Sequence, residues 1–150
     1  MRLGWVLAPA PLREALLAAK RYADLGSALL PQLVPARLME SGELERHLRL
    51  VRARHRRRRD AMVAAVAATL PGAVVYGAAA GLHLTITFGD EGLSDTGLAA
   101  AALAAGVKVQ PLSWHCRRPH RPGLVLGYAA STPGEIQDGV ALIGEALSGL

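Results

Sequence analysis

Apolar residues recur at helical spacing through the first half of the chain. Residues 2–9 are mostly apolar and are followed by prolines, which favours a strand that leaves a sheet for a helix over residues 11–23. Residues 27–41 predict a second helix, which Pro31 can begin and Pro35 delays. From residue 43 to residue 69, apolar positions repeat every three or four residues, so we expect one long amphipathic helix.

The second half of the chain predicts strands that alternate with helices. Residues 82–88 alternate strictly between two sides of a strand. One side, which we expect to face the core, carries Leu82, Leu84, Ile86 and Phe88, and the other carries His83, Thr85 and Thr87. Further strands are expected over residues 73–76, 107–110 and 124–129.

Two helices complete this half. One is capped by Ser94 or Asp95 and stops at Gly106, and the last is capped by Ser131 or Thr132. The simplest arrangement of these elements is one sheet covered by helices on one side, which is an α+β domain.

Composition limits the kinds of protein this chain can be. Its 150 residues suit one domain, but the core must come from Leu, Val and Ala because the chain has a single Phe. The single Cys116 excludes an internal disulfide framework and fits a reducing compartment. Residues 61–82 carry no charge, yet prolines and glycines divide them into pieces too short to span a membrane.

The positive charge is concentrated in one segment. The formal net charge is +5, and eight of the fifteen arginines lie between Arg46 and Arg59. Arg52, Arg56 and Arg59 share one side of the predicted long helix, while the others spread around it and no aromatic residue interleaves. This pattern favours a solvated or domain-bridging face over a nucleic-acid patch. A stand-alone basic module that binds nucleic acid remains the alternative.

Other candidate chemical groups favour structural interpretations. His115, Cys116 and His120 lie close together in sequence, but they lack a nearby acidic ligand, so we assign no metal site. His83 is expected to pack or form a hydrogen bond rather than act as a base. We assign no catalytic residue, because neither Lys20 nor Lys108 has an evident acidic or aromatic partner for Schiff-base chemistry.

Several short segments, in order, resemble the aminotransferase-like domain of MocR-type regulators, a branch of the GntR family of transcription factors. The similar segments lie along nearly the whole chain: Arg2-Leu3-Gly4-Trp5, Ala8-Pro9, Gln32, Gly42, His47 to Asp60, Gly81-Leu82-His83-Leu84, Gly106-Val107, Pro111-Leu112-Ser113, Leu126-Gly127-Tyr128-Ala129 and Ile136-Gln137-Asp138-Gly139-Val140.

The resemblance implies a fold, a cofactor and partners. The family has the fold of type I pyridoxal-phosphate enzymes, so residues 1–42 would be a remnant of the large domain, 43–72 a long interdomain helix and 73–150 the small C-terminal domain. The chain would then be the C-terminal part of a cytoplasmic regulator. The parent would form a homodimer, bind DNA through an N-terminal domain absent here, and bind pyridoxal 5'-phosphate through a lysine upstream of Arg2.

Two positions bear on activity. The resemblance gives Arg2 the role of pairing with the cofactor phosphate, although Arg2 can equally be a solvated N-terminal side chain. The arginine that holds a substrate carboxylate in aminotransferases is matched here by Val125, which cannot form that pair. We therefore expect an effector or cofactor sensor that is inactive alone. A truncated pyridoxal-phosphate-dependent aminotransferase is the alternative within the same resemblance.

Overall fold

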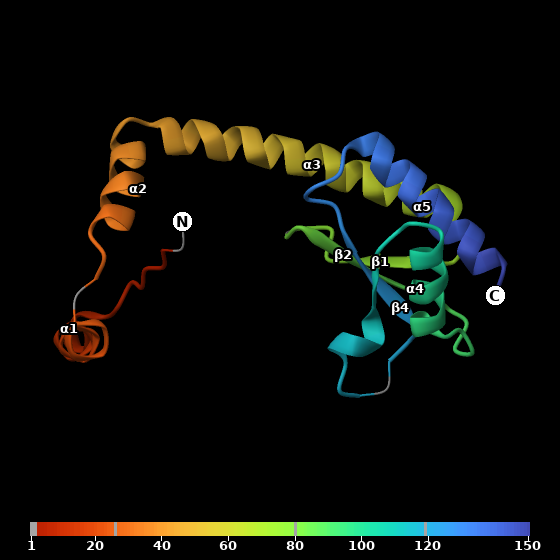
Figure 1. Cartoon of the computed structure of the whole chain (residues 1–150), viewed down its shortest axis with the longest axis horizontal. Coiled ribbons are helices and arrows are strands. Elements are labelled where there is room, and N and C mark those ends of the chain that lie inside the picture. The colour runs from red at the N-terminus through yellow and green to blue at the C-terminus, as the bar shows by residue number, and fades with distance from the viewer. Residues whose placement is uncertain (1–2, 26, 80, 119) are drawn as a thin grey trace. The chain divides into compact units, whose positions relative to one another are not determined.

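A computed structural model describes residues 3–25, 27–79, 81–118 and 120–150 (Figure 1). Arg2 therefore lies outside the described residues. The chain divides into two compact units, Met1–Leu50 and Val51–Leu150, and the division falls within one helix. The domain boundaries expected at residues 42 and 72 stay a prediction.

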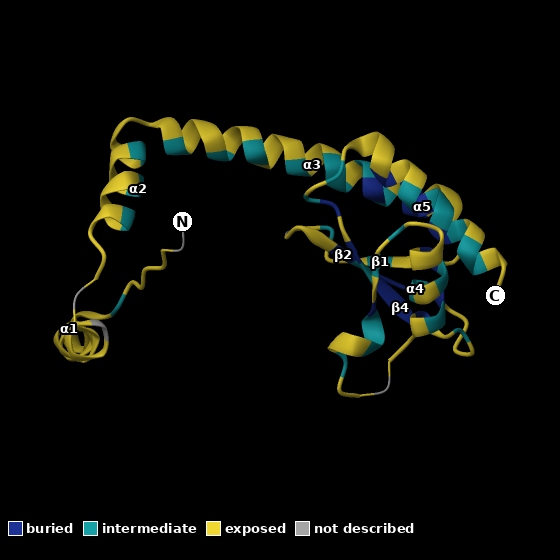
Figure 2. Ribbon diagram, in the orientation of Figure 1, coloured by how far each residue is buried: buried dark blue, intermediate teal, exposed yellow. Residues whose placement is uncertain are grey.

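The first unit is helical and largely exposed. It contains α1 (Ala10–Asp24), α2 (Leu30–Glu40) and the first residues of α3 (Glu43–Thr69), and none of its described residues is buried (Figure 2). The strand expected over residues 2–9 is wrong for described residues 3–9, which form no strand and have no neighbouring strand to supply hydrogen bonds. Pro35 also lies inside α2 instead of delaying it, so α2 continues despite one missing N–H donor.

Helix α3 has the bounds that the periodicity predicted. Gly42, with a φ of +73°, adopts the left-handed conformation between α2 and α3. Its N–H donates to the Met39 carbonyl, and its carbonyl accepts from the Arg46 N–H, so the residue joins the two helices. No helix in the described ranges is both long enough and apolar enough to cross a membrane.

The second unit is built on a four-stranded antiparallel sheet. Its strands lie in the order β1-β2-β4-β3, with β1 Val74–Tyr76, β2 His83–Thr87, β4 Gly123–Gly127 and β3 Gln110–Pro111. Of the expected strand 107–110, only Gln110 lies in β3, together with the following Pro111. A short 3-10 helix, η1 (Leu112–His115), follows directly. Strands and helices therefore alternate as the pattern predicted, with a shorter edge strand.

The core lies on one side of this sheet. Leu84 and Ile86 of β2 pair with Leu126 and Leu124 of β4, and all four are at most 2% exposed. Three helices contribute buried side chains to the same core: Met62, Ala65 and Val66 from α3, Leu98 and Ala102 from α4 (Asp95–Ala104), and Ile136, Val140 and Ile143 from α5 (Pro133–Ser148). The expected α+β sheet covered on one side is confirmed. Leu82, expected in this core, is 40% exposed because β2 begins one residue later.

A buried carboxylate joins α4 to η1. Asp95 is 6% exposed in the first turn of α4, where an acidic side chain is favoured by the helix dipole. Its carboxylate accepts hydrogen bonds from the Ser113 N–H at 2.9 Å and the Ser113 hydroxyl at 2.8 Å. The N-cap of α4 is Ser94, whose hydroxyl accepts from the Gly97 N–H. Ser113 thus fixes the segment that follows β3.

The last helix begins with a capping box. The Thr132 hydroxyl accepts from the Glu135 N–H, and the Glu135 carboxylate accepts from the Thr132 N–H at 2.6 Å. The hydrogen bond from the Thr132 backbone lowers the pKa of Glu135 below its ordinary value of 4.5. The hydrogen bond with the Thr132 side chain and the positive charge of Arg58 lower this pKa as well.

Replacing Asp95 with Asn is expected to lower the free energy of unfolding by about 1.5–3 kcal/mol, because the Ser113 donors lose a charged acceptor. Urea unfolding of the chain measures the change. Asp138→Asn, at an exposed position of α5, removes the same charge and should change the stability little. Equal effects of the two substitutions would contradict a specific role for Asp95.

The capping box predicts a pH dependence. Because the folded pKa of Glu135 lies below the unfolded value, its ionised form stabilises the fold above pH 4.5, and this contribution disappears as the pH falls through the folded pKa. The difference in unfolding free energy between the chain and Glu135→Gln should therefore be present at pH 7 and shrink below pH 4.5. Urea titrations across this range measure it, and a difference independent of pH would be inconsistent with the assignment.

Candidate functional site

The side of the sheet opposite the core forms the candidate site, which we call the open face. Strand register places its side chains in three rows. The outer rows are His83 with Gly127, and Val74 with Thr87 and Gly123; the central row is Tyr76, Thr85, Val125 and Gln110. Tyr76 is 51% exposed and Val74 44% exposed, in contrast to the buried leucines and isoleucine on the other side. Among the described helices of this unit, α3, α4 and α5 bury the core side, and Leu112 of η1 lies next to Gly123 on the open face.

The central row carries one aliphatic group among three polar side chains. Thr85 lies opposite Val125 on the paired strands, and Gln110 lies opposite Val125 from the other side. The Gln110 amide oxygen is 3.0 Å from His115 Nε2, so η1 holds one end of the row. Hydroxyl and amide groups can form neutral hydrogen bonds to a ligand here, but the row contains no cation to pair with a carboxylate.

Each outer row contains a glycine at a position where a Cβ would come close to a neighbouring group. A Cβ on Gly127 would come 3.3 Å from the His83 ring, so the absent side chain leaves room for that imidazole beside β4. A Cβ on Gly123 would come 2.3 Å from the Ile86 carbonyl oxygen, so this position requires glycine. His83 lies on the polar side of its strand, as the alternation predicted.

Thr87 is the least satisfied polar group on the open face. Its side chain is 9% exposed, and its hydroxyl has no hydrogen-bond partner among the described residues. A buried hydroxyl without a partner costs about 1–3 kcal/mol. This part of the face is therefore a source of instability.

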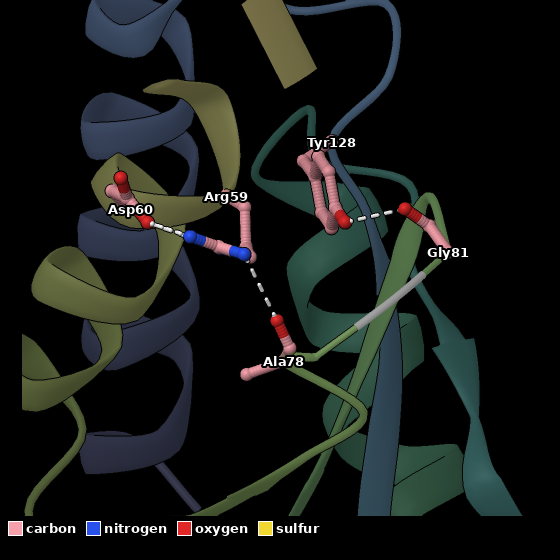
Figure 3. Close-up of polar contacts among 5 residues, drawn as sticks. All are labelled: Arg59, Asp60, Ala78, Gly81 and Tyr128. Atoms are coloured by element: carbon pink, nitrogen blue, oxygen red, sulfur yellow. Dashed lines mark hydrogen bonds and ion pairs between the residues drawn. The ribbon is translucent and has the colours of Figure 1, made fainter. Parts of the chain in front are cut away.

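The loop between β1 and β2 is held by a hydrogen bond near each of its ends (Figure 3). The Arg59 guanidinium donates to the Ala78 carbonyl at 3.3 Å and pairs with Asp60 at 2.6 Å. The Tyr128 hydroxyl donates to the Gly81 carbonyl at 2.7 Å, and Tyr128 is 2% exposed. Contacts from α3 and from the residue that follows β4 thus hold the segment before β2 in place.

The other candidate residues are not members of the central row. Lys20 is in α1, and Lys108 is exposed between α4 and β3. Within the described ranges, no three His, Cys, Asp or Glu side chains gather closely enough to hold a metal ion. His120 Nδ1 lies 2.7 Å from the Arg121 carbonyl, and Cys116 is a half-buried free thiol.

Strand alternation was the available signal for Thr85 and Thr87, but the central row was not predicted from the sequence. Its members come from four strands, and the register that aligns them depends on pairings between residues far apart in sequence. The Asp95 to Ser113 contact was missed for the same reason, since 18 residues separate its partners.

Curated proteins of Bacillus subtilis (strain 168) resemble part of the chain. The uncharacterized HTH-type transcriptional regulator YisV is 40% identical over 63 residues, which make up 42% of this chain and 13% of that protein. The uncharacterized HTH-type transcriptional regulator YdfD is 35% identical over 66 residues, or 44% of this chain and 14% of that protein. No family model matches the sequence.

Solved aminotransferase structures resemble nearly the whole chain. LysN, the α-aminoadipate aminotransferase of Thermus thermophilus, was solved with N-(5'-phosphopyridoxyl)-L-leucine; it is 28% identical with a TM-score of 0.78, over 95% of this chain and 37% of that chain. The multiple substrate aminotransferase of Thermococcus profundus has a TM-score of 0.82 at 24% identity, over 95% of this chain and 36% of that one.

Together these similarities define the class of protein. The chain has an aminotransferase fold, and it spans a little over a third of the aminotransferase chains that it matches. Its sequence is similar to HTH-type transcriptional regulators. These similarities confirm the predicted resemblance to the aminotransferase-like domain of MocR-type regulators and the predicted fold class.

The unpartnered hydroxyl gives a prediction on the open face. Thr87→Val replaces it with a methyl group of similar shape, so the free energy of unfolding should rise by about 1 kcal/mol. Thr85→Val, on the same side of the same strand but half-buried, is the matched control and should change it less. Urea unfolding of both variants measures the difference, and a destabilised Thr87→Val chain would refute the assignment.

Proposed function

We propose that this chain is the C-terminal portion of an aminotransferase-like transcriptional regulator that recognises a cofactor or effector without transaminating it. The observation that carries the proposal is the central row of the open face. Val125 occupies the place where the family resemblance puts the carboxylate-binding arginine, and its cross-strand neighbours Thr85 and Gln110 are uncharged. An isopropyl group cannot supply the paired hydrogen bonds that a guanidinium gives a carboxylate.

The residues on this face do not fit a covalent role toward pyridoxal phosphate. That cofactor, when bound to an enzyme lysine, supplies an electron sink for carbanion chemistry. The open face carries no amine, because Lys20 and Lys108 lie on other segments. We therefore derive no catalytic step, and we propose that the anchoring lysine of the parent lies outside this sequence, with Arg2 beside the cofactor phosphate.

The remaining parts of the proposal concern the parent protein. Its similarity to HTH-type regulators supports DNA binding through a separate N-terminal domain. We further propose that the parent is a cytoplasmic homodimer, and that the open face of the sheet lines one side of the ligand cleft. The polar row would then bind an effector through neutral hydrogen bonds rather than through a charge pair.

Reductive labelling tests whether this chain can carry the cofactor. The chain is incubated with pyridoxal phosphate and reduced with borohydride, and the phosphopyridoxyl label is located by peptide mass mapping. We expect no stoichiometric label on Lys20 or Lys108, because nothing on the open face brings either amine to a cofactor site.

The reductive labelling experiment requires two controls. An aminotransferase with an intact cofactor lysine must label stoichiometrically under the same conditions. Lys108→Arg keeps the charge of the chain and should leave the weak background labelling at Lys20 unchanged. Stoichiometric labelling of a single lysine in the chain, abolished by Lys→Arg at that position, would overturn the proposal that it is not catalytic.

A further inference from the structure

A small basic crevice lies beside the loop between β1 and β2, apart from the open face. Its volume is about 260 Å³, and it is lined by Arg52, His55, Arg56, Arg59, Ala79, Gly81 and Tyr128. The four basic residues lie within two turns of α3 at helical spacing, so they form a single stripe on that helix. The crevice lies wholly within the second compact unit.

The charges in this crevice are unbalanced. None of the described residues that line it is acidic. Arg59 is paired with Asp60 and also donates to the Ala78 carbonyl (Figure 3), so its charge is largely used within the protein. Arg52 and Arg56 form no ion pair with any described residue, which leaves two guanidinium charges for a ligand.

The walls of the crevice are held in place. Arg59 fixes Ala78 on one side of the loop, and the Tyr128 hydroxyl fixes the Gly81 carbonyl on the other. A preorganised wall reduces the ordering cost of binding. The half-buried His55 also lines the crevice.

We propose that this crevice binds the phosphate group of a small phosphate monoester. Two free guanidinium groups match a dianion, and each can donate two hydrogen bonds to neighbouring phosphate oxygens. The small volume favours a compact ligand over a nucleic-acid backbone, and the crevice offers no exposed aromatic ring for base stacking, since Tyr128 is buried.

The test is a calorimetric titration of the whole chain at about 0.1 M salt, where charges more than roughly 10 Å apart are largely screened. The probes are phenyl phosphate, inorganic phosphate and a DNA duplex. The double variant Arg52→Gln with Arg56→Gln removes the two free charges of the crevice. Arg54→Gln with Arg57→Gln is the matched control, because it makes the same change of charge at exposed positions that do not line the crevice.

The expected result is saturable binding of phenyl phosphate, tighter than that of inorganic phosphate. The crevice variant should weaken it roughly tenfold or more, while the control should change it by less than about twofold. Absence of saturable binding, equal weakening by both variants, or duplex binding that outcompetes phenyl phosphate would overturn the proposal. Inorganic phosphate bound as tightly as the ester would overturn the choice of a monoester. These outcomes are independent of lysine labelling, so this site can fail while the proposed function stands.

Discussion

The antiparallel pairing of β2 with β4 is the constraint on which the second unit depends. It aligns Leu84 with Leu126 and Ile86 with Leu124, so that four large apolar side chains form one surface against three helices. Each such side chain contributes roughly 1.5–3 kcal/mol when it is fully buried. The same register places Thr85 opposite Val125 on the reverse side. A shift by one residue would exchange the two sides, so the core and the central row of the open face are fixed together.

Polar contacts over long sequence distances then position the segments around this pair. Asp95 holds Ser113 next to β3, and Tyr128 holds Gly81 at the start of β2. Arg58 donates to the Ala129 carbonyl, which ties α3 to the end of β4. These contacts position segments around the sheet and do not involve the side chains of the central row.

Local patterns predicted most of the elements but not the site. The periodicity of residues 43–69 and the Ser94 cap depend on neighbours in sequence, and both predictions are confirmed. The alternation through β2 is confirmed for Leu84 and Ile86 but is wrong at Leu82, which is exposed, and at Thr87, which is buried. The strand expected over residues 2–9 failed because apolar character alone supplies no partner strand. The central row could not be predicted because Gln110 meets Val125 only through a tertiary pairing. Helical spacing correctly predicted that Arg52, Arg56 and Arg59 lie on one side of α3. It did not predict that the loop between β1 and β2 lies beside them and lines the crevice.

The one-sided core has a consequence for how such a protein can evolve. Fold stability depends on the side chains that meet α3, α4 and α5, whereas Val125 and Thr85 sit on the reverse surface of the same strands. Under the proposed function, substitutions at these two positions alter ligand preference while leaving the interior unchanged. At Val125 and Thr85, selection for a ligand and selection for folding therefore act on different sets of side chains.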